Sequence, residues 1–362
     1  MDLQALFAEA DRRNVSDIYL KVGVPAMIRA EGETLPYDDH VLTPEDTRQV
    51  AHLIMGEGSK RRDFEANPEM NLAYSVPGVG RFRVNFYVQR GSTAMVMRRV
   101  KSEVPTIEGM GLPPMLGTLA MDERGLILVT GATGSGKSTT LAAMIHHRNL
   151  HATGHILTIE DPVEFLHTDA KSIVSQREIG TDTESFEQAL KNALRQAPDV
   201  ILIGEMRDRE SVKAALDFAE TGHLVLSTLH STNANQTVER ILQFFPADQH
   251  QQVLQLLASN LKGIISQRLL RRSDGKGRVA AIEMMITTQR IRELLYNNDL
   301  VKLKSTIEQG VNEGMQTFDQ HIYQLHKVDN LITVEEAMAN ADSPNDLRLR
   351  IRGLSSGGLS IS

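Results

Sequence analysis

The sequence contains no cysteine among its 362 residues. This absence excludes a disulfide framework and any zinc site that uses cysteine ligands. The HExxH pattern, which places two histidine ligands of a catalytic zinc on one helix face, is also missing. We therefore expect the protein to hold no structural metal.

Long apolar runs and an excess of positive charge are absent as well. No run approaches the roughly 18 apolar residues that span a bilayer. The first segment, MDLQALFAEADRR, is acidic and amphipathic rather than a signal sequence. We therefore expect a cytoplasmic protein that reaches a membrane only through partners. The formal net charge of −7 disfavours general binding to nucleic acid, because such binding needs a broad surface of Lys and Arg.

The pattern of the sequence changes near residue 100, and the chain is long enough for two domains. Residues 1–100 combine amphipathic helical segments with short alternating segments, which predicts a small α+β domain. Residues 101–120 are rich in proline and glycine and predict a linker that acts as a hinge.

Residues 121–340 alternate apolar runs with helical segments, which predicts an α/β domain. The runs GLILVTG, HILTIED, DVILIGE and HLVLSTLH are typical of strands in a parallel sheet that is buried on both faces. From about residue 246 onward the pattern is helical, apart from GRVAAIEMMI. Residues 341–362 predict a flexible tail, because the last dozen lack the apolar content to pack.

The segment GATGSGKST, residues 131–139, matches the phosphate-binding loop pattern GxxxxGK[ST]. It follows an apolar strand and precedes a helix, which is the context that the loop requires. We expect the backbone N–H groups to bind ATP phosphates, Lys137 to neutralise the β and γ oxygens, and Ser138 to bind Mg²⁺. The predicted nucleotide-binding residues of the loop are Gly131, Thr133, Gly134, Ser135, Gly136, Lys137, Ser138 and Thr139.

Acidic residues end two further predicted strands. Glu205 follows DVILIG at the Walker B position, where a carboxylate reaches hydrated Mg²⁺. Glu160, Asp161 and Glu164 follow the run HILTI. Carboxylates at strand ends can also cap helices, but beside a phosphate loop they predict ATP hydrolysis, in which the protein positions a water in line with the γ-phosphorus.

Two histidines, His223 and His230, flank one apolar run in AETGHLVLSTLH. A single half-buried histidine is most often structural. A strand that only fills a core has little use for imidazole at both ends, however, and Thr228 and Glu220 stand close by in the sequence. Together these residues predict contacts outside the core.

Four segments occur in the order and spacing of the Walker A, Asp box, Walker B and His box of the secretion-superfamily ATPases. They are GATGSGKST, HILTIEDPVEFLH, ILIGEMRD and ETGHLVLSTLH. The chain resembles the pilus-retraction branch of this superfamily, the PilT/PilU family, over nearly its whole length. The resemblance implies a homo-hexameric ring whose subunits have a PAS-like N-terminal domain and a RecA-like ATPase domain. It also implies a motor at the inner-membrane face of a type IV pilus machine, where ATP hydrolysis powers pilus retraction and twitching motility.

The resemblance further assigns roles to the polar residues of these segments. Glu164 matches the family's general-base glutamate, and Glu205 matches its Walker B glutamate. If Glu164 is not the base, the alternatives are Glu160 and Glu205. The His box implies that His223 and His230 lie at the nucleotide and sense its γ-phosphate.

A cation that arrives when the site closes completes an ATPase of this kind. Arg81 and Arg83 alternate onto one face of a predicted strand, and Arg98 and Arg99 follow the next one. A solvated basic edge is the commoner explanation of strand arginines. The resemblance implies that some of them contact nucleotide, and we take Arg81 and Arg98 as candidates. Further candidates, near the Walker B strand, are Arg195 and Arg207.

Departures from the family pattern favour one branch. The chain lacks the tetracysteine zinc motif that is usual in pilus-assembly and type II secretion ATPases, which favours retraction over extension. The PilT retraction motif AIRNLIRE corresponds to RIRELLYN, residues 290–297, without the final Arg-Glu. The segment ALRQAPDV and the longer tail resemble PilU more closely. We predict a PilU-type ATPase, with a main PilT-type motor as the alternative.

Two interpretations are open for the helix predicted over residues 289–303. It is an amphipathic helix that packs against the domain, or its sequence affects pilus retraction. Because it departs from AIRNLIRE, we predict a ring that hydrolyses ATP but depends on a PilT-type ATPase ring and on the membrane platform protein of the pilus machine. We predict that the tail from about residue 340 helps to form the contact with the PilT-type ring. Two other classes stay open: a nucleic-acid translocase with the same core, and a ring that docks on a partner ATPase without turnover of its own.

Overall fold

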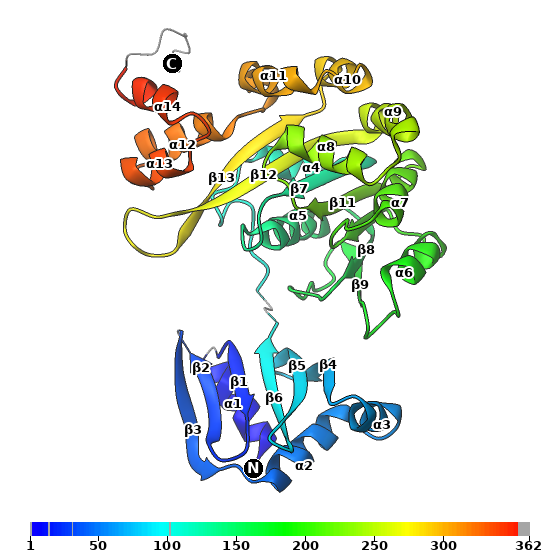
Figure 1. The fold of residues 1–362 in the computed structure, drawn as a ribbon, viewed down its shortest axis with the longest axis vertical. Coiled ribbons are helices and arrows are strands. Elements are labelled where there is room, and N and C mark those ends of the chain that lie inside the picture. Colours follow the sequence, from blue (N-terminus) through cyan, green and yellow to red (C-terminus); the bar gives the residue numbers. More distant parts are fainter. Residues whose placement is uncertain (1, 14, 31, 101–102, 354–362) are drawn as a thin grey trace. The chain divides into compact units, whose positions relative to one another are not determined.

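The computed structural model describes residues 2–13, 15–30, 32–100 and 103–353. The chain divides into two compact units, and each has its own hydrophobic core. Unit 1 consists of Met1–Glu103, Val163–Leu166 and Gly180–Asp182, and unit 2 contains the rest of the chain (Figure 1). No helix in the described part of the chain is long and apolar enough to cross a membrane.

Unit 1 is built on one antiparallel sheet. In chain order its elements are α1 Leu3–Arg12, β1 Asp17–Leu20, β2 Pro25–Ala30, β3 Glu33–Val41, α2 Pro44–Met55, α3 Ser59–Ala66, β4 Glu69–Val76, β5 Gly80–Gln89 and β6 Ser92–Arg99. The strand order is β3-β2-β1-β6-β5-β4. Alternation along β5 turns Phe82 and Phe86 toward the core, where the ring of Phe7 on α1 lies 4.8 Å from that of Phe82. The other face of β5 carries the arginines.

Unit 2 is built on a larger, mostly parallel sheet. Its elements are α4 Met115–Ala120, β7 Gly125–Thr130, α5 Lys137–His151, β8 Gly154–Glu160, β9 Ser172–Glu178, α6 Phe186–Ala193, η1 Leu194–Gln196, β10 Val200–Ile203, α7 Arg209–Glu220, β11 Leu224–Leu229, α8 Ala234–Gln243, η2 Ala247–Gln249, α9 His250–Asn260, β12 Leu261–Arg271, β13 Arg278–Ile286, α10 Gln289–Tyr296, η3 Leu300–Lys302, α11 Leu303–Gln309, η4 Val311–Glu313, α12 Phe318–Lys327, α13 Val334–Asn340 and α14 Pro344–Ile351. The strand order is β13-β12-β7-β11-β10-β8-β9, with only β13 antiparallel to its neighbour.

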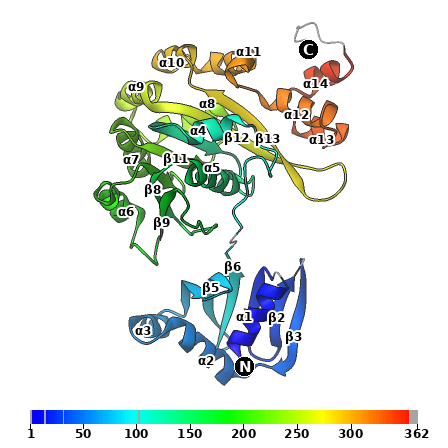
Figure 2. The ribbon, with the colours of Figure 1, turned by 180° about the vertical axis from the view of Figure 1, so that it is seen from behind.

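The apolar runs of unit 2 are buried on both faces of this sheet. On β7, Leu126 and Leu128 pack with α6 to α10, whereas Ile127 and Val129 pack on the other face with α4 and α5. Figures 1 and 2 show helices on both sides of the sheet. The outer part of the β12–β13 hairpin forms a further small core with α12, α13 and α14. The α/β class predicted from the sequence is therefore confirmed.

The structure corrects four predictions about secondary structure. The predicted linker 101–120 ends in α4, because Leu116 and Leu119 are buried against the sheet. The region after residue 246 contains β12, and β9 was not predicted either. The helix predicted over 289–303 ends at Tyr296, and Asn298 adopts a left-handed φ of 54° that interrupts it.

The predicted tail 341–362 is also corrected in part. It contains α14, whose Leu347 is buried with α12 and α13. Asp342 pairs with Arg268 of β12 at 2.7 Å, so this segment is held by charge as well as by packing. Residues 354–362, to which the expected flexibility also referred, lie outside the described residues.

Candidate active site

The phosphate loop spans residues 131–136, between the end of β7 and the start of α5. Its three glycines, Gly131, Gly134 and Gly136, have positive φ angles of 149°, 76° and 89°. A Cβ on Gly131 would lie 2.5 Å from both the Gln267 carbonyl oxygen and Ser135 Oγ. Only glycine allows the loop to fold this tightly between β7 and β12.

Lys137 and Ser135 give the loop its polar interior. The buried Lys137 Nζ donates hydrogen bonds to the carbonyl oxygens of Gly131 at 2.9 Å and Ala132 at 3.1 Å. Ser135 Oγ is buried and has no hydrogen-bond partner among the described residues. A buried hydroxyl without a partner costs free energy, so the loop is suited to a ligand that supplies an acceptor oxygen. Ser138 and Thr139 follow in α5 and are half-buried, while Thr133 and Gly134 are exposed.

Glu205 lies just beyond β10 and is held through both of its carboxylate oxygens. Arg207 Nε donates to Oε2 at 2.6 Å, and His230 Nε2 lies 2.8 Å from Oε1. Arg207 Nη1 also lies 3.4 Å from Asp161 Oδ2, so one guanidinium joins the acidic ends of two strands. The hydrogen bond to Glu205 raises the pKa of Arg207 further above its ordinary value, and this residue therefore stays a cation.

The parallel sheet brings most of these groups to one edge. The phosphate loop follows β7, Glu160 ends β8, Glu205 lies just beyond β10, and His230 follows β11. These four strands are parallel, so their carboxyl ends lie at the same edge of the sheet. Glu160 Oε1 accepts hydrogen bonds from Thr158 at 2.7 Å and Gln176 at 3.3 Å. Thr228 Oγ1 donates to the Gly204 carbonyl at 2.8 Å, which fixes the end of β11 beside the Walker B strand.

The structure does not bring His223 to this edge. His223 precedes β11, whose first residue pairs with Gly125, the first residue of β7, whereas the phosphate loop follows the last residue of β7. Six strand residues span roughly 20 Å. His223 Nδ1 instead contacts the Phe218 carbonyl at 3.1 Å, where α7 ends. The expectation that both histidines serve one nucleotide within a subunit is therefore corrected, and only His230 is retained.

Arg98 lies on the open face of the unit 1 sheet. Its Nε donates to Asp17 Oδ1 at 2.8 Å, an interaction that raises the pKa of Arg98. Asp17 is buried, and Arg29 approaches its other oxygen at 3.7 Å. Arg83 stands directly opposite Arg98 in the strand register. Four charged residues thus form a row across β2, β1, β6 and β5.

The remaining predicted residues of unit 1 are Arg81 and Glu164. Arg81 is half-buried on β5, on the face opposite Phe82. Glu164 belongs to the segment Val163–Leu166, which clusters with unit 1. Their contacts with a nucleotide remain predictions. Arg195, the further candidate near β10, lies in η1, where its Nη1 contacts Asn192 Oδ1 at 3.5 Å.

One residue that contacts the phosphate loop was not predicted from the sequence. Gln267, in the middle of β12, is 1% exposed and forms hydrogen bonds with both the phosphate loop and α5. The only signal in the sequence is the polar pair Ser266-Gln267 inside the apolar run GIISQRLL. Ser266 Oγ accepts a hydrogen bond from Thr130 Oγ1 at 3.1 Å, at the last residue of β7.

Comparisons with known proteins give this geometry a context. Residues 71–290 match the family model described as "Type II/IV secretion system protein". The type IV pilus ATPase PilU of Pseudomonas aeruginosa is 49% identical over 97% of this chain and 92% of its own length. The type IV pilus retraction ATPase PilT of the same organism is 43% identical over 96% of this chain and 100% of its own length. The chain belongs to the type II/IV secretion system protein family.

A solved structure of a member of this family supports the fold assignment. The pilus retraction motor PilT with bound ADP matches with a TM-score of 0.88 and 45% identity, covering 96% of this chain and 99% of that one. The resemblance to the PilT/PilU branch of the secretion ATPases and the assignment as a P-loop ATPase are thereby confirmed. The 49% identity to PilU against 43% to PilT agrees with the prediction of the PilU type.

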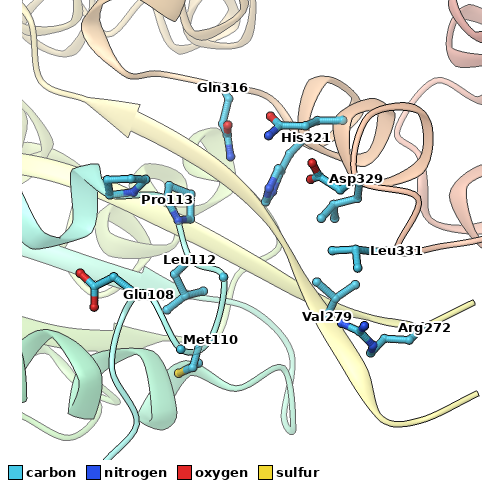
Figure 3. Close-up of a pocket in the computed structure, with 15 residues that line it drawn as sticks. Glu108, Met110, Leu112, Pro113, Arg272, Val279, Gln316, His321, Asp329 and Leu331 are labelled. Carbon is cyan, nitrogen blue, oxygen red and sulfur yellow. The ribbon is translucent and has the colours of Figure 1, made fainter. Parts of the chain in front are cut away.

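A pocket of unit 2 is lined by residues outside the phosphate loop. This pocket of about 540 Å³ opens between residues 108–114 and the β12–β13 hairpin (Figure 3). Glu108 and Met110 line one side, and His321 and Asp329 line the other. His321 Nδ1 accepts a hydrogen bond from the Ile282 N–H at 2.9 Å, and burial lowers its pKa to about 4. The imidazole is therefore neutral and carries its hydrogen on Nε2.

Proposed function

We propose that this chain is a cytoplasmic hexameric ATPase that assists type IV pilus retraction, and hence twitching motility, as a PilU-type partner of a PilT-type motor. The observation that carries the proposal is the meeting of a phosphate loop with the linked residues Glu205 and His230 at one edge of a parallel sheet. The identities to PilU and PilT over nearly the whole chain support the assignment to the retraction branch.

We assign ATP binding to the phosphate loop and to Lys137. Lys137 Nζ already lies inside the loop, against the carbonyls of Gly131 and Ala132. Transfer of this ammonium from the carbonyl oxygens to the β and γ oxygens of ATP replaces neutral acceptors with anionic ones, to which a cation donates stronger hydrogen bonds. The start of α5 adds the positive end of a 15-residue helix.

The donor set fits Mg²⁺, which prefers oxygen ligands and keeps several waters. The Ser138 hydroxyl in the first turn of α5 and the Glu205 carboxylate beyond β10 are the residues that would hold it. When bound, the ion supplies charge neutralisation at the phosphates. Glu205 is only partly exposed, which suits a carboxylate that reaches an ion through water.

Proton transfer is assigned to Glu164 rather than to Glu205. Both oxygens of Glu205 are engaged, by Arg207 and His230. A carboxylate that is held on both oxygens is better suited to orient its neighbours than to accept a proton from an attacking water. Glu160, which accepts from Thr158 and Gln176, is also engaged. Glu164 then acts as the base, and His230 carries the state of the γ-phosphate from Glu205 to β11.

The assembly is proposed as a homo-hexamer at the inner-membrane face of the pilus machine. There the ring would contact a PilT-type ATPase ring and the platform protein of that membrane. Arg81 and Arg98 of unit 1 would supply the cation that completes the site when the ring closes around ATP. The net charge of −7 argues against nucleic acid as the partner.

The proposal is tested first by separating binding from turnover. Lys137→Ala should abolish binding of labelled ADP and hydrolysis together, because the main point charge on the phosphates is lost. Glu164→Gln should retain binding but lose turnover. A Glu164→Gln protein that hydrolyses ATP at the wild-type rate would move the base to Glu160, and a wild-type protein without ATPase activity would refute the proposal.

A further inference from the structure

Gln267 is a buried polar residue inside an otherwise apolar strand. Its side chain lies on β12 and is 1% exposed. A buried amide must find partners for its carbonyl oxygen and its NH₂ group, or it destabilises the fold by a few kcal/mol. Leu or Ile at this position would fill the same space without that cost. We therefore expect the amide to hold in place the groups with which it forms hydrogen bonds.

Both partners of Gln267 belong to the nucleotide site. Its Nε2 donates to the Ser135 carbonyl oxygen at 2.7 Å, and its Oε1 accepts from Thr140 Oγ1 at 2.7 Å. Ser135 is in the loop, and Thr140 is in the first turn of α5. One amide thus bridges the loop and the helix that together bind the phosphates.

The loop is shaped around this amide. A Cβ on Gly136 would lie 2.7 Å from Gln267 Nε2, and one on Gly131 would lie 2.5 Å from the Gln267 carbonyl oxygen. Two of the three glycines of the loop are thus required by the close approach of Gln267. The pairing of β12 with β7 fixes the backbone of this residue, because Ile265 lies opposite Val129 and Ser266 opposite Thr130.

We propose that Gln267 is a positioning residue that holds the phosphate loop in the conformation that binds nucleotide. By fixing the Ser135 carbonyl on the β12 side, the amide keeps the adjoining N–H groups and Ser135 Oγ directed at the loop interior. The role requires one donor and one acceptor at once, which glutamine has and which leucine and glutamate lack. This inference rests on the proposed ATPase function for its role in turnover, but not for its role in binding.

The experiment measures the affinity for a fluorescent ADP analogue and, separately, kcat and KM for ATP. Gln267→Leu removes both hydrogen bonds at similar volume and should weaken ADP binding about 10-fold or more, because the loop loses its fixed shape. Thr140→Val removes one bond and should have a smaller effect. Thr140→Ser keeps the hydroxyl and should lose less affinity than Thr140→Val. The double variant Gln267→Leu/Thr140→Val should be no worse than Gln267→Leu, since both act on one bridge.

A matched control separates positioning from stability. Gln316 lies in the same unit, and its Nε2 donates to the Ile282 carbonyl at 3.0 Å on β13. Gln316→Leu removes one hydrogen bond of a half-buried glutamine away from the loop and should leave ADP affinity unchanged. Wild-type affinity in folded Gln267→Leu, or an equal loss in Gln316→Leu, would overturn the inference. If Gln267→Leu does not fold, Thr140→Val against Thr140→Ser decides, and equal affinity of these two overturns it.

The same data keep the two proposals apart. A wild-type protein that binds ADP but does not hydrolyse ATP refutes the ATPase proposal and leaves the affinity test of Gln267 intact. Normal hydrolysis with unchanged ADP affinity in Gln267→Leu refutes only the positioning role.

Discussion

His230 Nε2 lies 2.8 Å from Glu205 Oε1 and so joins the carboxyl ends of β11 and β10. The two strands are also joined by Thr228, which donates to the Gly204 carbonyl, and by the Met206 N–H, which donates to the Thr228 carbonyl. Three contacts thus connect the segment that carries Glu205 with β11.

His230→Ala should lower kcat while leaving the affinity for ADP nearly unchanged. The loss should be about 10²-fold, as for removal of one positioned polar group from an active site. The matched control is His223→Ala at the other end of the same strand, which should leave kcat unchanged in protein that folds normally. Steady-state kinetics with both variants checks this, and an equal loss of kcat in the two would contradict the assignment.

Arg98→Ala should reduce turnover by on the order of 10³ or less without reducing ATP affinity, because a cation that arrives late acts on the transition state. Arg29→Ala is the control, since Arg29 also pairs with the buried Asp17. Both variants remove a cation from Asp17, and thermal unfolding measures the stability that each loses, but only Arg98→Ala should lose kcat. If Arg29→Ala lowers kcat by the same factor, the loss comes from disturbance of the sheet and not from loss of a nucleotide contact.

Arg81 on β5 should behave in the same way. Arg81→Ala should also lower kcat with ATP affinity retained, because its proposed contact forms when the site closes. A fall in ATP affinity that matches the fall in rate would instead indicate a contact made already in the ground state.

Glu283 should make the stability of the protein depend on pH. Burial raises the pKa of this carboxyl to about 7, while its partner is the Ala234 N–H at the start of α8, with Asp342, Lys304 and Arg268 nearby. The folded state therefore retains a proton that the unfolded chain releases above its ordinary value of 4.5. The free energy of unfolding should fall by up to about 3 kcal/mol as the pH rises from 4.5 to 7.

The Glu283→Gln variant provides the test of that pH dependence. The amide oxygen still accepts from the Ala234 N–H, but the group no longer titrates. Denaturant unfolding at a series of pH values should show a smaller fall in stability for the variant than for the wild type over this range. Identical pH profiles would show that Glu283 is not the titrating group.

The sequence predicted the phosphate loop well, because all of its determinants are local: an apolar strand, three glycines and a helix start within residues 125–151. It gave no prediction for Gln267, which is far from Lys137 along the chain and reaches the loop only through the pairing of β12 with β7. The contact of Gln267 with the loop is defined only by the place of β12 beside β7 in the strand order. It also misplaced His223, because the resemblance assigned both histidines of the His box to the nucleotide although His223 precedes its strand and the phosphate loop follows β7.

The C-terminal segment should contain two parts that respond differently to truncation. A chain that ends at Ala341 loses Asp342, which pairs with Arg268 and Lys304, and Leu347, which is buried. It should therefore unfold at a lower temperature. A chain that ends at Gly353 keeps these contacts, so it is the variant with which a role of residues 354–362 in partner contact is measured.

The chain that ends at Gly353 should be tested in cells that also hold a PilT-type motor. Pilus retraction should be impaired in these cells if residues 354–362 contribute to the contact with the partner. Unimpaired retraction would show that residues 354–362 are dispensable for it. The Ala341 truncation cannot serve this purpose, because its loss of packing in the small core of α12 to α14 would itself lower function.

ATP hydrolysis by this chain is proposed to assist retraction that a PilT-type motor drives. The most direct test is the retraction rate of labelled pili in cells that hold the PilT-type motor with either the wild-type chain or Lys137→Ala, at equal protein levels. We predict slower or weaker retraction with Lys137→Ala, and little retraction by the wild-type chain alone. Equal retraction with the two chains, or vigorous retraction by the wild-type chain alone, would contradict this role.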